Sequence, residues 1–435
     1  MKAATIATIF YIILFSLLSA TISFPDVFQL VFTPVRAAME GISPYAYVDR
    51  YKSACLWLDA TYPPLFYRLI TPYYLGLLRL GVFGALINET CPVWPFITNG
   101  LILFFIKFPY LVAQIASALI FSRMFSTERF KWYVFYLFQP LPMFVGAMMG
   151  QFDGLMVLAV VMATYLLLKQ KYPMSALIFG VAGAIKHQPF LVAAPLLWRW
   201  KEIPARKLMA TIFLITPYLI ALWMSDFEEI RRRVFGFSEN TKMMAAKIDL
   251  GWGVEMPIFV ILYLVSCWLV WRRRNEEATG LGRIAMIGLL FLLPYYLVTP
   301  WFLQRILILV PYLAMFGVVH KFGFRLLHLV NLLFFIWAIF GYPGVLDSVL
   351  LRGLWPKADY ILPVAARISS AVAIPVKDLG RYSLAGVNTV LLILYILAGW
   401  PKQNKKLYLP NRRDFLLLGM PLVVYLAVIS LNLLQ

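Results

Sequence analysis

Three basic side chains of this sequence lie in or next to strongly apolar stretches, where a positive charge needs a partner. Lys186 and His187 are adjacent in the middle of one such stretch, and Arg305 begins another directly after a tight turn. An ammonium group near the centre of a bilayer costs at least roughly 2.5 kcal/mol on insertion scales, so an anionic partner or ligand is expected. The planar guanidinium of an arginine that faces a groove is suited to clamping a phosphate. The pattern therefore predicts an anion site inside the apolar part of the protein.

One acidic side chain could serve as a general base beside that site. Asp26 follows the first apolar run and is preceded by Pro25, which places it at the membrane boundary. A carboxylate held there could accept the proton of an attacking hydroxyl. An acid at an interface also costs little structurally, so a structural role is the alternative for this residue.

The other candidate residues each have a structural alternative. Gly150-Gln151-Phe152-Asp153 could contribute to a substrate site, or it could be a helix-breaking glycine followed by an Asp cap. Lys186 could bind a ligand or form an internal ion pair with an acid such as Asp153. Arg305 could face a groove or extend to the lipid headgroups.

The composition places these residues in a membrane protein. Of the 435 residues, 62% are hydrophobic and 14% are charged, and the mean hydropathy is +0.80, whereas soluble globular chains carry about 25% charged residues. The 39 Lys and Arg outnumber the 20 Asp and Glu, which in a soluble chain would suggest a nucleic-acid partner. In a polytopic protein the excess belongs instead to cytoplasmic loops and to contacts with anionic lipids, so no nucleic acid is expected.

Apolar runs close to the roughly 20 residues that cross a bilayer predict an all-α transmembrane bundle of about 11 full spans. The first run, residues 3–24, enters from the cytoplasm, and the later runs are 97–122, 132–149, 154–170, 207–224, 254–271, 284–299, 304–320, 326–343, 383–400 and 414–434. No stretch between them resembles a soluble domain. We therefore expect residues 1–435 to form a single membrane domain.

The basic connections between the spans predict one further, broken helix pair. Loops rich in Lys and Arg should all be cytoplasmic, yet the stretch between Lys171 and Arg199 has such loops at both ends and is long enough for only one crossing. Two half-helices broken near Lys186-His187-Gln188-Pro189 would return the chain to the same side. Irregular backbone and charge at that depth are tolerated where they line a polar cavity or are buried in protein.

This topology leaves three sizeable segments outside the membrane, residues 25–96, 225–253 and 344–382. The first contains two amphipathic stretches, 27–40 and one that ends near residue 85, and we expect both to lie on the outer surface as interfacial helices. The second contains Arg231-Arg232-Arg233, which opposes the positive-inside rule unless the loop is long enough to escape it or the arginines hold an anion. Cys55 and Cys91 share the predicted outer side, so they could form a disulfide or remain two thiols.

Taken together, the motifs resemble those of the C-type glycosyltransferases, which are polytopic enzymes that use polyprenyl-phosphate sugars. The elements of the resemblance occur in the same order as in those families: Asp26, Gly41, Pro44-Tyr45 and Tyr62-Pro63-Pro64; Gln139-Pro140 with Gly150-Gln151-Phe152-Asp153; Lys186-His187-Gln188-Pro189 with Pro195; Arg233–Ser238 with Gly251-Trp252; and Thr299–Arg305 with Pro311. The first group is similar to the first external loop of these enzymes. The next three are similar to the dolichyl-phosphate-glucose glucosyltransferases, and the last is similar to the first mannosyltransferase of GPI-anchor synthesis.

Two departures keep the match at the level of the superfamily. Asp26 stands alone where the GPI enzymes have a paired acidic motif, and Asp153 follows the Gly-Gln-Phe sequence where an aromatic residue is typical. Prokaryotic polyprenyl-phosphate-mannose transferases are equally similar. The resemblance implies a C-type catalytic module over residues 1–320, with 321–435 as additional C-terminal spans.

The activity that the resemblance implies is hexosyl transfer from a polyprenyl- or dolichyl-phosphate sugar to a hydroxyl of a lipid-linked or glycan acceptor. Mannose is favoured as the sugar, with glucose as the alternative. The reaction would take place on the outer or lumenal side of the plasma membrane of a prokaryote or of the endoplasmic reticulum of a eukaryote. Membrane lipids are the other expected partners.

The residues fit that chemistry in three roles. Expulsion of a phosphate needs charge stabilisation more than a proton, so Lys186, His187 and Arg305 are expected to bind the donor phosphate. Asp26 would act as the catalytic base in a single displacement with inversion. The expected substrate-binding residues are Gln151, Asp153, Gln188, Trp301, Gln304, Tyr45, Tyr62 and Arg233.

No metal and no other cofactor is expected, because the cations would neutralise a single phosphate and no Asp-x-Asp motif lies on the predicted outer side. The main alternative is a polytopic transporter or a lipid-linked sugar flippase, since an intramembrane lysine and broken helices also mark substrate pathways. A noncatalytic scaffold is the remaining alternative, and it should tolerate the loss of Asp26.

Overall fold

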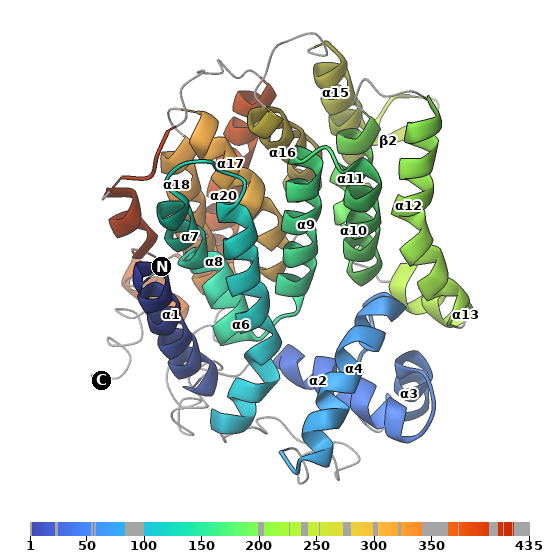
Figure 1. The fold of residues 1–435 in the computed structure, drawn as a ribbon. Coiled ribbons are helices and arrows are strands. Elements are labelled where there is room, and N and C mark those ends of the chain that lie inside the picture. The colour runs from blue at the N-terminus through green and yellow to red at the C-terminus, as the bar shows by residue number, and fades with distance from the viewer. Residues whose placement is uncertain are drawn as a thin grey trace.

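A computed structural model shows that the chain folds into a bundle of α-helices, which confirms the all-α class (Figure 1). The structure describes residues 2–21, 25–53, 55, 58–82, 100–198, 204–225, 227–235, 242–251, 253–272, 280–298, 303–320, 323–341, 364–372, 374–399, 408–411, 413–419 and 421. Within these residues, strands are limited to one antiparallel hairpin, in which β1 (Lys247–Asp249) pairs with β2 (Glu255–Pro257).

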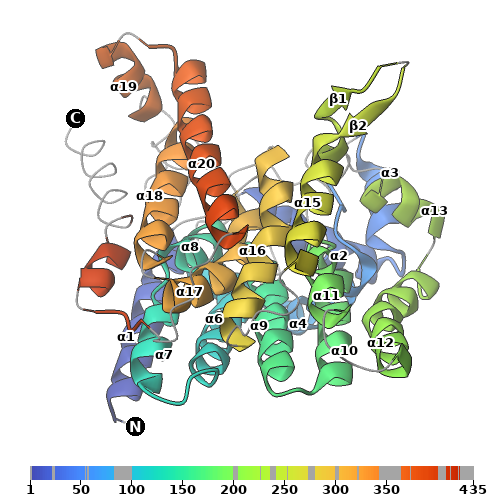
Figure 2. The same ribbon diagram turned by 90° about the horizontal axis from the view of Figure 1, so that it is seen from above.

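The α-helices are α1 (Lys2–Thr21), α2 (Pro25–Met39), α3 (Pro44–Tyr51), α4 (Pro64–Arg79), α6 (Gly100–Ser122), α7 (Arg129–Leu137), α8 (Pro140–Met143), α9 (Asp153–Leu168), α10 (Tyr172–Ile185), α11 (Pro189–Trp198), α12 (Pro204–Trp223), α13 (Phe227–Ile230), α15 (Ile258–Arg272), α16 (Gly280–Val298), α17 (Leu309–Val319), α18 (Gly323–Gly341), α19 (Val364–Val372) and α20 (Val376–Gly399). Two π-helices, η1 (Phe144–Met149) and η2 (Arg231–Phe235), and two 3-10 helices, η3 (Lys242–Met244) and η4 (Leu303–Ile308), complete the described elements. Figure 2 shows α16 and α17 in the interior of the bundle, and nearly all of their described side chains are buried.

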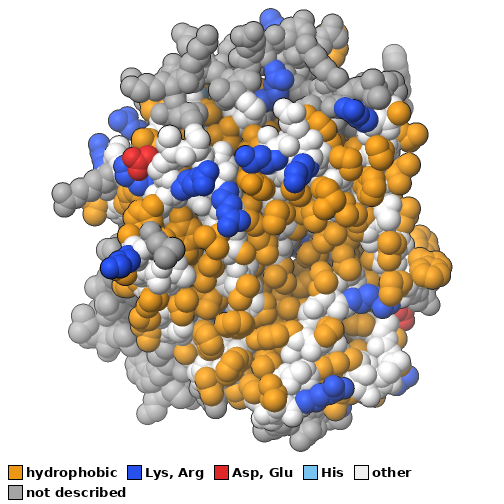
Figure 3. Space-filling model, in the orientation of Figure 1, with side chains coloured by type: hydrophobic (Ala, Val, Ile, Leu, Met, Phe, Trp, Pro, Cys, Tyr) orange, Lys and Arg blue, Asp and Glu red, His pale blue; other side chains and the backbone are white. Residues whose placement is uncertain are grey.

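Membrane spans are confirmed in part. Four helical stretches are long and apolar enough to cross a membrane: Lys2–Ala20, Gly100–Ser122, Ala205–Trp223 and Gly280–Val298. The other apolar helical stretches of the described chain, such as Gly323–Trp337 in α18 and Leu384–Ala398 in α20, have 10–17 residues, so the expectation of about 11 full spans is not confirmed. Figure 3 shows a broad hydrophobic band on one face, with Lys and Arg side chains gathered above it.

The expected span over residues 132–149 is wrong as a continuous helix. It is divided into α7, α8 and η1, and the break falls at Gln139-Pro140. Proline lacks a backbone N–H and disfavours helical geometry in the residue before it, so a helix ends there. The expected last span, 414–434, lies mostly outside the described residues.

The broken helix pair is present as α10 and α11, which are separated by Lys186-His187-Gln188. They contain 14 and 10 residues, or about 21 and 15 Å of helix, so neither reaches across a hydrocarbon core of about 30 Å. A Cβ on Gly183 of α10 would stand 2.4 Å from the Phe190 ring of α11. The absence of a side chain at Gly183 is therefore what allows the ring of the second half-helix to pack against the first.

The segment after α1 forms α2, α3 and α4, which lie together at one end of the bundle (Figure 1). Gly41 has φ +68°, a conformation that favours glycine and ends α2. Ser43 then caps α3 by accepting a hydrogen bond from the Ala46 N–H at 2.9 Å. Both amphipathic stretches predicted here are thus helical, and their position at a membrane interface stays a prediction.

A buried lysine that the sequence reasoning overlooked holds three elements together. The Lys107 ammonium of α6 donates to the backbone oxygens of Ser19 (3.1 Å), Ala147 (2.9 Å) and Met148 (3.2 Å). The first carbonyl belongs to α1 and the other two belong to η1. Lys107 therefore fixes the π-helix that leads into Gly150 and Gln151.

We expect Lys107→Met to destabilise the bundle, because the substitution keeps the chain length but removes a donor from three buried carbonyls. Each acceptor left unsatisfied costs about 1–3 kcal/mol. The unfolding midpoint in detergent, followed by tryptophan fluorescence, should fall clearly below that of the wild type. Lys171→Met is the control, because Lys171 is an exposed lysine at the turn between α9 and α10. Equal stability of the two variants would contradict the anchoring role.

Candidate functional site

The centre of the candidate site is an ion pair between Lys186 and Asp153. The lysine ammonium contacts Oδ1 of the aspartate, whose side chain is fully buried, while the lysine side chain is 17% exposed. Removing charges from water is costly, and a close partner of opposite sign compensates that cost. The internal pair that the sequence left as an alternative is therefore present, and one side of the lysine remains open.

Local backbone features bring the two charges together. Gly150 has φ +67°, which lets the chain turn from η1 into α9, whose first residue is Asp153. Lys186 leaves α10 in an extended conformation, with φ −157° and ψ 137°. Ser175 ties α10 to α9 by donating to the Ala163 carbonyl at 2.8 Å. The pair therefore forms where α9 begins and α10 ends.

Asp153 does not cap α9, so that alternative is wrong. Phe152 occupies the cap position, and no side-chain cap hydrogen bond is made. The second carboxylate oxygen of Asp153, Oδ2, is buried and has no hydrogen-bond partner within the described part of the chain. A buried acceptor of this kind is suited to a donor group of a ligand.

Three more of the predicted residues surround this pair. The Tyr62 ring lies over the Lys186 ammonium with its centroid 5.5 Å away, and its hydroxyl donates to Gln151 Oε1 at 3.5 Å. Tyr45 donates its own hydroxyl to the Tyr62 carbonyl at 2.6 Å. Burial raises the pKa of Tyr45, which keeps its hydroxyl protonated as a donor. We call Lys186, Asp153, Tyr62 and Gln151 the Lys186 cluster.

The two residues after Lys186 contribute differently. His187 Nε2 is 2.6 Å from the Tyr218 hydroxyl of α12, a partner that the sequence did not indicate. Gln188 is buried, and neither its amide nitrogen nor its amide oxygen has a hydrogen-bond partner among the described residues. Unsatisfied buried amide groups are costly, so the broken helix presents polar atoms that a ligand could satisfy.

Arg305 lies in η4 and is only 7% exposed, so the alternative that it extends to the lipid headgroups is wrong. Its Nη1 donates to the Tyr295 hydroxyl at 3.2 Å, and its carbonyl accepts from Tyr296. The helix η4 packs against α9. The element that carries Arg305 therefore adjoins the element that begins with Asp153.

Asp26 lies in the first turn of α2, and its side chain is outside the described residues. Helix α2 packs against α4, and α4 packs against α10, so the helix that carries Asp26 is linked through α4 to the helix that ends beside Lys186. Trp301 is outside the described residues, as is the side chain of Gln304 in η4.

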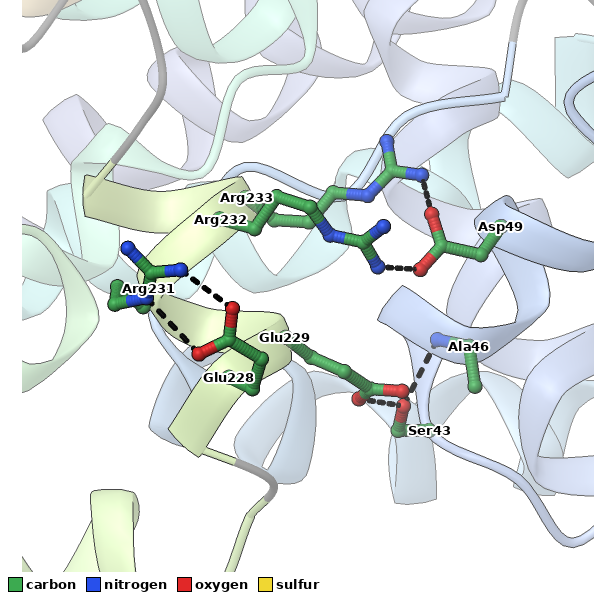
Figure 4. A network of polar contacts seen from close by, with 8 residues as sticks. All are labelled: Ser43, Ala46, Asp49, Glu228, Glu229, Arg231, Arg232 and Arg233. Carbon is green, nitrogen blue, oxygen red and sulfur yellow. Dashed lines mark hydrogen bonds and ion pairs between the residues drawn. The ribbon is translucent and has the colours of Figure 1, made fainter.

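The predicted arginine triplet is paired with carboxylates of the protein. Figure 4 shows Arg232 and Arg233 each bound to one carboxylate oxygen of Asp49 from α3, and Arg231 bound to Glu228. Ser43 adds a hydrogen bond of 2.6 Å to Glu229. We call these contacts the clasp, because they join α3 to α13 and η2. Arg233 is the most buried of the three arginines, and its Nε has no partner among the described residues.

The described residues include two of the three cysteines. Cys55 is disulfide-bonded, Cys267 is a free thiol, and Cys91 lies outside them. Within the described ranges, no group of three His, Cys, Asp or Glu side chains is placed to hold a metal ion.

These features define an integral membrane protein with a polar site enclosed by its helices. The sequence model of glycosyltransferase family 87 matches residues 60–300, which is more than half of the chain. The chain therefore belongs to this family of polytopic C-type-like glycosyltransferases, and the resemblance found in the motifs is confirmed. No curated protein matches the chain. The matched region includes Tyr62, Gln151 and Lys186, whereas Asp26 and Arg305 lie outside it.

We expect Asp153→Asn to destabilise the protein by about 3–5 kcal/mol, because it leaves the Lys186 ammonium uncompensated inside the bundle. The double variant Asp153→Asn/Lys186→Met removes both charges and should recover part of that loss. The unfolding midpoints of Asp153→Asn, of Lys186→Met and of the double variant in detergent measure the coupling between the two residues. Glu40→Gln, at the more exposed Arg50–Glu40 pair, is the control, with an expected effect below about 1 kcal/mol. Strict additivity of the two single changes would contradict the pairing.

Proposed function

We propose that this membrane glycosyltransferase moves a hexose, mannose in preference to glucose, from a polyprenyl or dolichyl phosphate to a hydroxyl of a lipid-linked or glycan acceptor. The reaction would occur at the outer or lumenal face of the membrane. The observation that supports the proposal best is the Lys186 cluster, in which a half-enclosed cation and unsatisfied polar atoms meet at the break of a helix.

The cations would hold the phosphate of the donor. An ammonium group carries several N–H donors, so Lys186 can contact Asp153 and a phosphate oxygen at the same time. The Asp153 carboxylate compensates the charge of the ammonium and keeps it in place inside the bundle. Arg305 and His187 would complete the clamp, because fixed donors stabilise the negative charge that develops on the departing phosphate.

The unsatisfied polar groups would bind the sugar. Asp153 Oδ2 and the Gln188 amide are buried without partners in the described chain, and the hydroxyl groups of a hexose supply both donors and acceptors. Gln151, Tyr62 and Tyr45 would add contacts from the Lys186 cluster and its surroundings, and Gln304 and Trp301 would add further contacts to the substrate. The Nε–H of Arg233 could add a contact from the clasp.

Asp26 would act as the base for the acceptor hydroxyl. The packing of α2 on α4 and of α4 on α10 supports this role, because it links the helix of Asp26 through α4 to the helix that ends beside Lys186. A single displacement by the activated hydroxyl inverts the anomeric configuration, because attack comes from the face opposite to the phosphate.

The purified protein should be incubated with radiolabelled polyprenyl-phosphate mannose or polyprenyl-phosphate glucose and extracted membrane lipids. We expect a labelled lipid or glycan product, more from mannose than from glucose, with inverted configuration at the anomeric carbon. The same reaction with the Lys186→Ala variant should show a higher KM for the donor. A product with retained configuration, or no product with either sugar, would contradict the proposal.

Asp26→Asn should leave the protein folded and reduce transfer to background, because the amide cannot accept a proton from the attacking hydroxyl. Initial rates with the labelled donor, together with gel filtration and the unfolding midpoint, measure the two effects separately. Asp249→Asn is the matched control, since Asp249 is an exposed aspartate in β1 and should transfer at the wild-type rate. Wild-type turnover by Asp26→Asn would end the assignment of this residue.

A further inference from the structure

A cavity of about 490 Å³ lies beside the Lys186 cluster and contains none of its residues. Its walls come from α2, the start of α3, α4 and the end of α12. The volume falls in the range of about 300–1,000 Å³ that is typical of small-molecule sites. Tyr45 is the lining residue that the proposed function assigns to substrate binding, so the cavity as a whole is distinct from the donor site.

The cavity carries one cationic side chain. Arg68 of α4 lines it and is exposed, and one of its N–H groups donates to the backbone oxygen of Met224 at the end of α12. This contact orients the guanidinium, whose planar fork carries further N–H donors. Such a group pairs well with a phosphate or a carboxylate, which it can bind through two parallel hydrogen bonds.

The remaining walls are largely apolar. Pro34, Ala38, Ile42 and Pro72 line the cavity. The hydroxyls of Ser43, Tyr45 and Thr71, which also line it, already donate to oxygen atoms of the protein. Thr71, for example, donates to the Tyr67 carbonyl at 2.6 Å, and Ser43 donates to Glu229 in the clasp. One anion-binding group beside apolar walls is suited to an amphipathic ligand with an anionic group.

Exposed apolar side chains lie close in sequence to the lining residues Met224 and Arg68. At the end of α12, next to Met224, Trp223 is 88% exposed and Leu219 is 55% exposed, and Phe227 follows at 58%. Leu69, beside Arg68, is 51% exposed. Tryptophan is enriched where proteins meet the membrane–water interface. A ligand can therefore enter from the lipid phase with its anionic group at the level of Arg68.

A tyrosine wall separates the cavity from the donor site. Tyr45 and Tyr67 line the cavity, and both bind the backbone of Tyr62, whose ring covers Lys186. The hydrogen bonds are 2.6 Å from the Tyr45 hydroxyl to the Tyr62 carbonyl and 3.4 Å from the Tyr62 N–H to the Tyr67 hydroxyl. Ligands on the two sides would be neighbours across a single residue.

We propose that this cavity binds the anionic headgroup of a membrane phospholipid, with the phosphate on Arg68 and the lipid chains along the apolar side of α2 and α4. If the protein has the function proposed above, this lipid is the acceptor, and its headgroup hydroxyl reaches the donor sugar past Tyr62. The site thereby assigns a phosphate-bearing lipid as the acceptor class.

Binding of soluble dioctanoyl phosphatidylglycerol to the full-length protein in neutral detergent tests the site by calorimetry, with no sugar donor present. We expect saturable binding that Arg68→Gln weakens at least tenfold. Arg79→Gln is the matched control, because Arg79 is an exposed arginine of the same helix that does not line the cavity. Dioctanoyl phosphatidylcholine should bind more weakly, and inorganic phosphate at the same concentration should show no comparable binding.

A second variant keeps the test valid if Arg68→Gln misfolds, because that substitution also removes the contact of Arg68 with Met224. Ala38→Phe keeps the arginine and fills the apolar side of the cavity, so it should weaken lipid binding to a similar extent. Equal affinities of Arg68→Gln and Arg79→Gln, wild-type affinity of Ala38→Phe, or binding of inorganic phosphate as tight as that of the lipid would each overturn the proposal.

The site and the proposed function can fail separately. Lipid binding without any transfer from either labelled donor would leave the site standing and remove the acceptor role. Transfer to a lipid without a phosphate would support the transferase and overturn the acceptor class. In the transfer reaction, Arg68→Gln should raise the KM for phosphatidylglycerol and leave the KM for the donor unchanged.

Discussion

Lys186 and Asp153 meet inside a bundle whose other side chains are mostly apolar, and the position of the candidate site depends on this contact. Neither charge is stable there without the other. Their pairing requires α9 to begin and α10 to end at the same depth, and it requires the chain to stop being helical between Ile185 and Pro189. The irregular backbone that leaves the buried amide of Gln188 without a hydrogen-bond partner in the described chain is thus maintained by an electrostatic contact.

The same constraint explains the second irregular region. Lys107 is buried, and backbone carbonyls of α1 and the π-helix η1 receive its hydrogen bonds. π-Helices are rare, and they occur frequently at functional sites. Because η1 runs directly into Gly150 and Gln151, this lysine and the ion pair hold the two ends of the turn that forms one wall of the site. These two lysines therefore fix the backbone in which the Lys186 cluster is built.

Much of this organisation could be predicted from particular residues. The break at Lys186–Pro189 followed from the positions of basic loops, and α2 and α4 followed from amphipathic stretches. Lys107 was overlooked, although the cost of a charge in an apolar run applies to it as it does to Lys186. The undivided span over 132–149 was wrong because the apolar pattern continues through Gln139-Pro140, where the backbone cannot. Partners such as Tyr218 and Asp49 are distant in sequence from the residues they contact, so no local pattern could indicate them.

Tyr62, in the segment before α4, contacts both the Lys186 cluster and the tyrosines that line the cavity. Its ring faces Lys186, its hydroxyl reaches Gln151, and its backbone is held by the two tyrosines that line the cavity. The clasp acts on the same region from the other side, because Ser43 both lines the cavity and binds Glu229. Exposed ion pairs contribute little stability one by one, so the main effect of the clasp is on geometry: it holds α3 against α13 and η2. A shift of α3 relative to α13 would alter the cavity. Through Tyr45, which binds the Tyr62 backbone, it would also move the ring that lies over Lys186.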